Sequence, residues 1–354
     1  MKAAVITDTH WGVRNDSFAM YDHFDAFYEN VFFPEIDRRS IKTIFHLGDI
    51  VERRKFINFV TLNRMRKGMI IPALERDIDI HYSVGNHDIP FRHTNVVNAM
   101  GELFGESYSK IHIYTDPTEV DFDGVKVLFV PWIHNQNFHQ SLELITSTKA
   151  QILMGHLELK GFEMYRGSPN HEGLDASLFK DFDIVCSGHF HHKSTSGNIN
   201  YLGSPYETTW HDFEDPRGFH IFDTETRELE FIENPYRLFV KLFYDDEGKT
   251  LEETIDWDFK ELKDKYVKVI VQNKTNPYWF DIAMQKLTDS NPSDYKIVDD
   301  HQNLDDEDAD DIISEAEDTL TILHAYVDKI KTAVNKSALS GLFSQLYTEA
   351  QHIE

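Results

Sequence analysis

The sequence has a single cysteine in 354 residues, so an internal disulfide is excluded. It has no run of about 18 apolar residues, and we therefore expect no membrane span. The first residues enter an apolar strand pattern without a basic segment and a cleavage site, so we expect no secretory signal. A lone thiol fits a reducing compartment, and we expect Cys186 to be a small core residue of a cytoplasmic protein.

Basic residues are also in deficit. The chain carries 35 Lys and Arg against 61 Asp and Glu, a net charge of -26 that argues against a polyanionic partner. The acids are unevenly placed, because residues 299–318 hold eleven of them and no base, which leaves -15 for residues 1–298. Residues 51–68, just after Asp49, carry six basic side chains and Glu52 alone as acid. This segment could guide a phosphate backbone or be a solvated helix face, and the sequence leaves both open.

What the sequence does contain is a set of five polar motifs, each at the end of an apolar run. The motifs are Asp8-Thr9-His10, Gly48-Asp49, Gly85-Asn86-His87-Asp88, Gly155-His156 and Gly188-His189-Phe190-His191. The preceding runs, at 3–6, 43–45, 82–84, 151–154 and 183–186, are typical of buried strands. Because sites in open α/β sheets form outside the carboxyl ends of strands, we expect these side chains to converge. Carboxylate, imidazole and carboxamide groups bind divalent transition metals, so the pattern predicts a two-metal hydrolase.

The motifs suggest how two metal ions would be shared. Such a pair needs a bridging carboxylate and separate ligands on each side. Asp49 is the natural bridge, since it stands alone at a tight strand end. Asp8 and His10 are two residues apart and need a turn to meet at one metal. His189 and His191 share that spacing and can split between the metals.

The third motif carries a ligand and two catalytic candidates. Asn86 offers a neutral oxygen, which lowers the charge of the site and leaves room for an anionic substrate. His87 follows directly and is free to act as a general acid or to stabilise the transition state. Asp88 is placed to orient that imidazole by hydrogen bonding.

The rest of the chain predicts three parts. A chain of this length with 41% apolar residues can bury more than one domain. Helices are expected at 17–37, 56–76 and 94–104, and strands at 125–130, 200–202, 219–222 and 228–232. Pro235 marks a boundary, so we expect a catalytic α/β domain at 1–235 and a small α+β module at 236–298. Residues 299–354 are expected to form an acidic linker and a helical segment.

The C-terminal segment has two apolar stripes with spacings of three and four, at 313–334 and 339–353, which predict two amphipathic helices. Such a hairpin can fold back on the small module or dock into a partner's coiled coil, and we favour docking. The candidate partner contacts are Leu320, Leu323, Val327, Leu342, Phe343 and Leu346.

The motif set, which spans residues 8–191, resembles the signature of the calcineurin-like metallophosphoesterases. Within that superfamily the chain is similar to the SbcD-type nuclease subunits and their phage counterparts in recombination and repair. The resemblance implies a four-layer α/β/β/α sandwich, a capping domain, DNA as substrate and a C-terminal segment that docks an SbcC-type coiled-coil ATPase. A homodimer is left open, and the host cytoplasm is the expected location if the gene belongs to a phage. It also implies two Mn²⁺ ions, with Mg²⁺ or another divalent metal as alternatives.

The resemblance also assigns roles. One ion would be held by Asp8, His10 and His191, the other by Asn86, His156 and His189, and both by Asp49, while His87 would be the catalytic histidine. Candidate DNA contacts are Arg53, Arg54, Lys55 and Ser204. Glu52 departs from the family pattern, since many members have a histidine there that positions the substrate, so exonuclease direction cannot be carried over. A phosphatase or cyclic-nucleotide phosphodiesterase on the same fold is the main alternative. A scaffold without catalysis is disfavoured because all seven ligand positions are filled.

Overall fold

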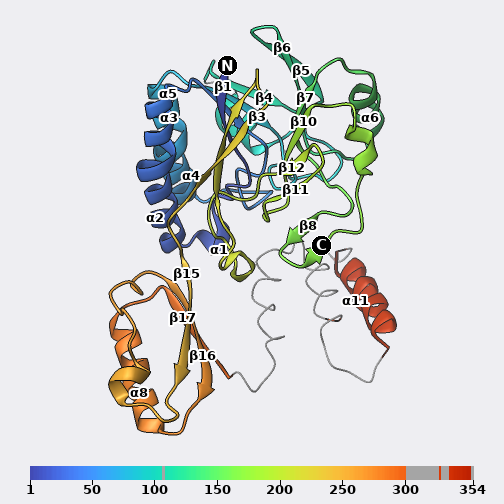
Figure 1. The fold of residues 1–354 in the computed structure, drawn as a ribbon. Coiled ribbons are helices and arrows are strands. Elements are labelled where there is room, and N and C mark those ends of the chain that lie inside the picture. Colours follow the sequence, from blue (N-terminus) through green and yellow to red (C-terminus); the bar gives the residue numbers. More distant parts are fainter. Residues whose placement is uncertain (106–107, 300–326, 328–334, 352–354) are drawn as a thin grey trace. The chain divides into compact units, whose positions relative to one another are not determined.

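The computed structural model describes residues 1–105, 108–299, 327 and 335–351 (Figure 1). The chain divides into two compact units, Met1–Leu238 and Phe239–Glu354. The division lies close to the expected boundary at residue 235, whereas the boundary expected at 298 stands at the edge of the described residues and stays a prediction. In the described ranges, no helix combines the length and apolar character that crossing a membrane would need.

The first unit contains two six-stranded sheets. The first sheet has the order β14 (Leu229–Glu233), β13 (Gly218–Asp223), β1 (Lys2–Ile6), β2 (Thr43–His46), β3 (Asp79–Ser83) and β4 (Ile111–Tyr114). Its strands from β1 to β4 are parallel, and β13 and β14 add antiparallel pairs at one side. The second has the order β11 (Ser194–Ser196), β12 (Ile199–Tyr201), β10 (Ile184–Gly188), β7 (Ile152–His156), β6 (Val125–Val130) and β5 (Thr118–Phe122). Its four central strands are parallel.

The two sheets pack face to face through alternate residues of their strands. Val5 of β1 and Phe45 of β2 belong to the same core cluster as Phe129 of β6 and Cys186 of β10. Cys186 is therefore a core residue, as expected. The other face of β6 is also buried, because Leu128 packs in a second cluster with Ile145 of α6 (Phe138–Ser147). Burial on both faces explains why these strands read as continuous apolar runs.

Helices cover the outer faces of the sheets. The first group is α2 (Phe18–Phe27), η1 (Tyr28–Phe32) and α3 (Phe33–Arg39), and the second is α4 (Phe59–Met65), η2 (Arg66–Ile70) and α5 (Ile71–Glu75). Figure 1 shows these helices on one flank of the first unit and α6 on the other, with the sheets between them. Phe32 anchors its group to β13, with its ring centroid 4.7 Å from that of Phe219. The expected helices at 17–37 and 56–76 and the four-layer α/β/β/α arrangement are confirmed.

The helix expected at 94–104 is found only in its second half. Residues 94–98 are irregular, and helical structure begins only at residue 99 and continues through η3 (Gly101–Gly105). Asn95 explains the difference, because its amide donates to the carbonyl oxygens of Thr115 (3.1 Å) and Trp132 (2.9 Å). A side chain that bonds to distant backbone competes with helix formation.

The second unit contains a three-stranded sheet of β15 (Phe239–Asp245), β16 (Tyr266–Asn273) and β17 (Asp294–Asp299). The helices α7 (Leu251–Thr254) and α8 (Pro277–Asp289) lie between consecutive strands in the chain, and all three strands are parallel. Strands and helices alternate in this region, where the sequence predicted a small module. The unit is, however, a parallel α/β layer, because a helix joins each pair of strands, where the sequence suggested an α+β module.

The expected C-terminal hairpin is described only in part. α11 (Lys336–Gln351) covers most of the second apolar stripe, and Leu342 and Leu346 on it are about half exposed. Val327 is buried. The rest of the first stripe, including Leu320 and Leu323, lies outside the described residues, so the hairpin and its role in docking stay predictions.

Candidate metal centre

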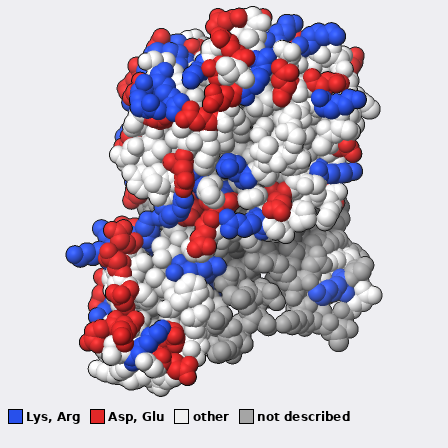
Figure 2. Space-filling view, in the orientation of Figure 1, with Lys and Arg blue, Asp and Glu red and all other residues white. Residues whose placement is uncertain are grey.

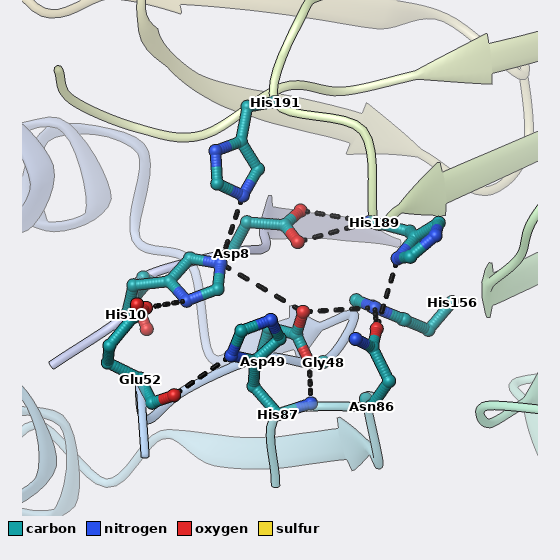
Figure 3. Close-up of polar contacts among 12 residues, drawn as sticks. Asp8, His10, Gly48, Asp49, Glu52, Asn86, His87, His156, His189 and His191 are labelled. Atoms are coloured by element: carbon teal, nitrogen blue, oxygen red, sulfur yellow. Dashed lines mark hydrogen bonds and ion pairs between the residues drawn. The ribbon is translucent and has the colours of Figure 1, made fainter. Parts of the chain in front are cut away.

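All five strands expected before the motifs are present, and the motif side chains meet where these strands end. Three of the strands, β1, β2 and β3, belong to the first sheet, and β7 and β10 belong to the second. The site therefore lies between the carboxyl ends of two facing sheets (Figure 3). The side chains brought together are Asp8, His10, Asp49, Asn86, His87, His156, His189 and His191.

The turn expected around Asp8 and His10 is made by unusual backbone. The φ angles of Asp8, His10, Asp49 and His189 are 52°, 41°, 54° and 87°. Residues other than glycine rarely adopt positive φ angles, and those that do cluster at functional sites. Backbone hydrogen bonds hold the first two turns together, from the amide of Asp8 to the carbonyl of Gly48 (3.0 Å) and from the amide of His10 to that of Asp49 (3.1 Å).

One group of donor atoms is formed by Asp8, His10 and His191, whose ligand atoms all lie within 4.8 Å of one another. The Nε2 atoms of His10 and His191 are 3.0 Å apart, a separation at which at most one of them carries a proton. Burial and the neighbouring His10 together lower the pKa of His191 to about 3. His191 is therefore a neutral imidazole with a free lone pair. Burial raises the pKa of Asp8, as does the charge of Asp49.

A second group is formed by Asp49, His156 and His189, again with ligand atoms within 4.8 Å of one another. Asn86 completes this group, since its Oδ1 atom lies 2.9 Å from His156 Nε2 and 3.0 Å from His189 Nδ1. The His156 ring is fixed from behind by the carbonyl oxygen of Leu47, 2.7 Å from Nδ1. Burial lowers the pKa of His189 well below its usual value, and His156 adds to that effect.

Asp49 lies between the two groups. Its Oδ2 atom is 3.2 Å from His156 Nε2 and 3.9 Å from His10 Nε2. Burial alone would raise the pKa of Asp49, but the charges of His156 and His87 outweigh it and hold the pKa well below the usual value. An ionised carboxylate with one group of donors on each side is the geometry that a bridging ligand requires.

The donor set fits a pair of divalent cations. Buried imidazole nitrogens and carboxylate and amide oxygens point at one another at 2.9–3.9 Å, with too few protons to satisfy every pair. Burying such groups is costly unless a positive charge stands among them. Nitrogen and oxygen donors without thiolate suit manganese, zinc or iron, and the donor chemistry does not choose among them.

His87 lies beside both of these groups of donor atoms and belongs to neither. Its backbone amide donates to Asp49 Oδ1 (2.8 Å), which ties it to the bridge. Its Nδ1 atom is 2.9 Å from the carbonyl oxygen of Glu52. A carbonyl can only accept, so Nδ1 carries the proton in that contact and Nε2 is the atom available for chemistry.

The chain is similar in sequence to known proteins. Residues 1–193 match the family model described as calcineurin-like phosphoesterase. The chain belongs to the calcineurin-like phosphoesterase family. Exonuclease subunit 1 of Enterobacteria phage T4 is 32% identical to it over 99% of each chain. The SbcD subunit of the nuclease SbcCD from Staphylococcus epidermidis is 27% identical over 44% of this chain and 41% of its own. Among solved structures, a purple acid phosphatase from yellow lupin gives a TM-score of 0.39 at 11% identity, over 65% of this chain and 52% of that one.

The role expected for Asp88 in this phosphoesterase is wrong. Asp88 does not hold the His87 ring. Its carboxylate accepts instead from four backbone amides, those of Gly85 (2.7 Å), Asp49 (2.8 Å), Ile50 (2.9 Å) and, more weakly, Val51 (3.5 Å). Asp88 therefore holds the turn that carries Asp49 against the turn that carries His87, and its role is structural.

Ser204 cannot serve as a DNA contact, because it is 1% exposed. Its hydroxyl accepts from Arg217 Nη1 (2.9 Å), and the same nitrogen also bonds to the carbonyl oxygen of His191. Arg217 is itself buried and paired with Asp212 (2.6 Å) and Asp215 (2.8 Å). These residues support the His191 turn of the phosphoesterase. Their spacing in the sequence gave no sign of this network.

The basic segment after Asp49 divides into parts with different surroundings. Residues 51–58 are irregular, so Arg53, Arg54 and Lys55 do not lie on a helix face. Arg53 is paired with Asp16 at 2.6 Å. Lys55 is exposed, and it lines a cavity of about 180 Å³ together with Arg54 and Phe56.

Figure 2 shows acidic and basic side chains intermingled on the face of the first unit that it presents, beside a broad uncharged band. This face does not form a continuous basic field.

Proposed function

We propose that this chain is a metal-dependent DNA nuclease that hydrolyses phosphodiester bonds as the catalytic component of a complex with a coiled-coil ATPase. The observation that carries the proposal is the convergence of six candidate ligand side chains around Asp49 at the ends of two sheets. The full-length similarity to a phage exonuclease subunit supports DNA as the substrate. The similarity to the SbcD component of the SbcCD nuclease supports a protein partner.

The two donor groups would each hold one ion, and we propose Mn²⁺ for both. Asp8, His10 and His191 would bind one, Asn86, His156 and His189 the other, and Asp49 both. Such a pair supplies an activated water, neutralises the phosphoryl oxygens and stabilises the leaving oxygen. The protein fixes the geometry through strained turns whose backbone is tied together by Asp88.

His87 is proposed to act on the substrate through Nε2. Its Nδ1–H donates to the carbonyl oxygen of Glu52, which fixes the ring and the tautomer. A protonated His87 donates from Nε2 to the leaving oxygen or to a phosphoryl oxygen. The hydrogen bond from the His87 backbone amide to the Asp49 carboxylate keeps the His87 ring beside the reacting phosphate.

The DNA strand is proposed to approach over the segment that contains Arg54 and Lys55. These side chains and the aromatic Phe56 line a cavity whose wall includes Asp88, next in sequence to His87. Phe56 is 64% exposed, so its ring is accessible to a base. Cationic side chains beside an accessible aromatic ring suit a nucleotide, since the cations meet phosphate and the ring stacks on a base.

The proposal is tested by incubating the purified full-length chain with linear duplex DNA and Mn²⁺ and measuring nucleotide release. A parallel assay uses p-nitrophenyl phosphate, a small phosphomonoester. Metal-dependent release from DNA with little activity on the monoester is the expected result. Activity on the monoester alone would make the chain a phosphatase, and activity on cyclic nucleotides alone a cyclic phosphodiesterase. His139→Ala, an exposed histidine on α6, is the control variant for changes at the centre.

A further inference from the structure

A glutamate outside the five motifs, Glu52, contacts two imidazoles of the centre. Glu52 Oε2 is 2.8 Å from His10 Nδ1, and the Glu52 carbonyl oxygen is 2.9 Å from His87 Nδ1 (Figure 3). One residue thus contacts a proposed metal ligand through its side chain and the proposed acid through its backbone. We propose that Glu52 is a positioning residue that orients His10 for metal binding and joins that ligand to His87.

The contact determines which nitrogen of His10 faces the metal. An ionised carboxylate only accepts hydrogen bonds, so it selects the tautomer with the proton on Nδ1. The Nε2 lone pair then points to the centre, where His191 Nε2 lies 3.0 Å away.

The two metal positions differ in the charge of the group that holds the histidine ligand from behind. His156, on the other side of Asp49, is held from behind by the neutral carbonyl oxygen of Leu47. His10 is held by an anion, which makes the imidazole a stronger donor. Glu52 therefore strengthens binding of the ion held by His10, Asp8 and His191. It does not change the affinity for the other ion. The side chain is 17% exposed, so its charge is only partly screened by water.

The test is a calorimetric titration of the metal-free, full-length chain with Mn²⁺. In Glu52→Gln the amide oxygen can still accept from His10 Nδ1 but carries no charge, and one of the two sites should weaken by roughly 10–100-fold. Glu52→Ala removes the acceptor as well and should weaken the same site further. The second site should keep its affinity in both variants. Glu230→Gln is the matched control, because Glu230, on β14, is also an ion-paired carboxylate, 2.6 Å from Arg39. The isotherm of this control should match that of the wild type.

A second measurement separates positioning from damage to the fold. Cleavage by Glu52→Gln should be lost at limiting Mn²⁺ and restored at saturating Mn²⁺, whereas a distorted site is not rescued by metal. An isotherm of Glu52→Ala that matches the wild type would overturn the proposal, as would equal weakening of both sites. Complete loss of one ion in Glu52→Gln would make Glu52 a ligand itself and would also overturn it. The inference rests on the proposed metal centre but not on DNA as substrate. Altered metal binding without DNA cleavage in the wild type would therefore count against the nuclease proposal alone.

Discussion

Gly85 lies so close to Asp49 that a methyl group on its Cα would overlap the Asp49 carboxylate and the Asp49 backbone nitrogen. The two residues follow neighbouring parallel strands, β3 and β2, and the missing side chain lets their turns meet. A position with no ligand atom thus controls where the carboxylate of Asp49, the proposed bridging ligand, lies.

Gly85→Ala should weaken metal binding by at least about tenfold although every donor atom is retained, since displaced ligands cost affinity. Overpacking of this kind also costs about 1–3 kcal/mol of stability, so thermal unfolding is measured beside the Mn²⁺ titration. Gly105→Ala is the control, because a methyl group there would make only ordinary contact with Ile113. Wild-type affinity in Gly85→Ala would mean that Asp49 has room to move.

Asp49→Ala should abolish cleavage and the binding of both ions, because the shared carboxylate is the charge that each group needs. Asp8→Ala should instead weaken one ion preferentially. Metal that binds only the folded state raises its stability, so Mn²⁺ should raise the Tm of the wild type and not that of Asp49→Ala. Two Mn²⁺ ions still bound to Asp49→Ala in a calorimetric titration would contradict the bridging role.

His87→Ala should have the opposite pattern, with metal binding kept and turnover lowered by roughly 10²–10⁴-fold, the range typical of a general acid or base. The structural reason is that His87 contacts the bridge only through its backbone amide, which the variant retains. Turnover and Mn²⁺ affinity are measured on the same preparation. A loss of metal that matches the loss of rate would make His87 a ligand.

The sequence was enough to predict the convergence of the ligands. Strand ends are marked by polar residues after apolar runs, and the carboxyl ends of parallel strands meet at one edge. Asp8 and Asn86 could therefore be placed together although they are far apart in the chain. That the two sheets face each other came from the resemblance, because nothing in the runs before Asp49 and His156 distinguishes one sheet from the other.

The sequence was not enough for contacts that depend on turn geometry. Asp88 was expected to hold His87 because it is next in sequence, but the turn directs its carboxylate to four backbone amides. Ser204 was expected at the surface, and a buried Arg217 holds it inside. In both cases a backbone group or a distant side chain competes for the same polar atom, and neither leaves a periodic pattern.

The double variant Arg54→Gln/Lys55→Gln should weaken DNA binding and flatten its salt dependence by up to ~0.9 log units per lost phosphate contact. Hydrolysis of a small phosphodiester should be unchanged, because the centre is untouched. Arg53→Gln is tested separately, since Arg53 is paired with Asp16 and its loss disturbs the loop. The measurement is DNA affinity at several salt concentrations. An unchanged slope in the double variant would show that the segment is only a solvated surface.

The last prediction concerns α11, where Leu342 and Leu346 lie one turn apart on the same face and are about half exposed. Apolar side chains four residues apart on a helix are the usual anchors for docking into a groove or a coiled coil. Leu342→Glu/Leu346→Glu should therefore abolish binding to the proposed ATPase partner and ATP-dependent processing of long duplexes, while Mn²⁺-dependent cleavage of short DNA continues at the wild-type rate. Lys336→Glu, on a different face of the helix, controls for the added charge. Co-purification with the ATPase and both cleavage assays are compared for the three proteins. If the double variant unfolds or loses cleavage of short DNA, this face belongs to the core of the chain and the partner binds elsewhere.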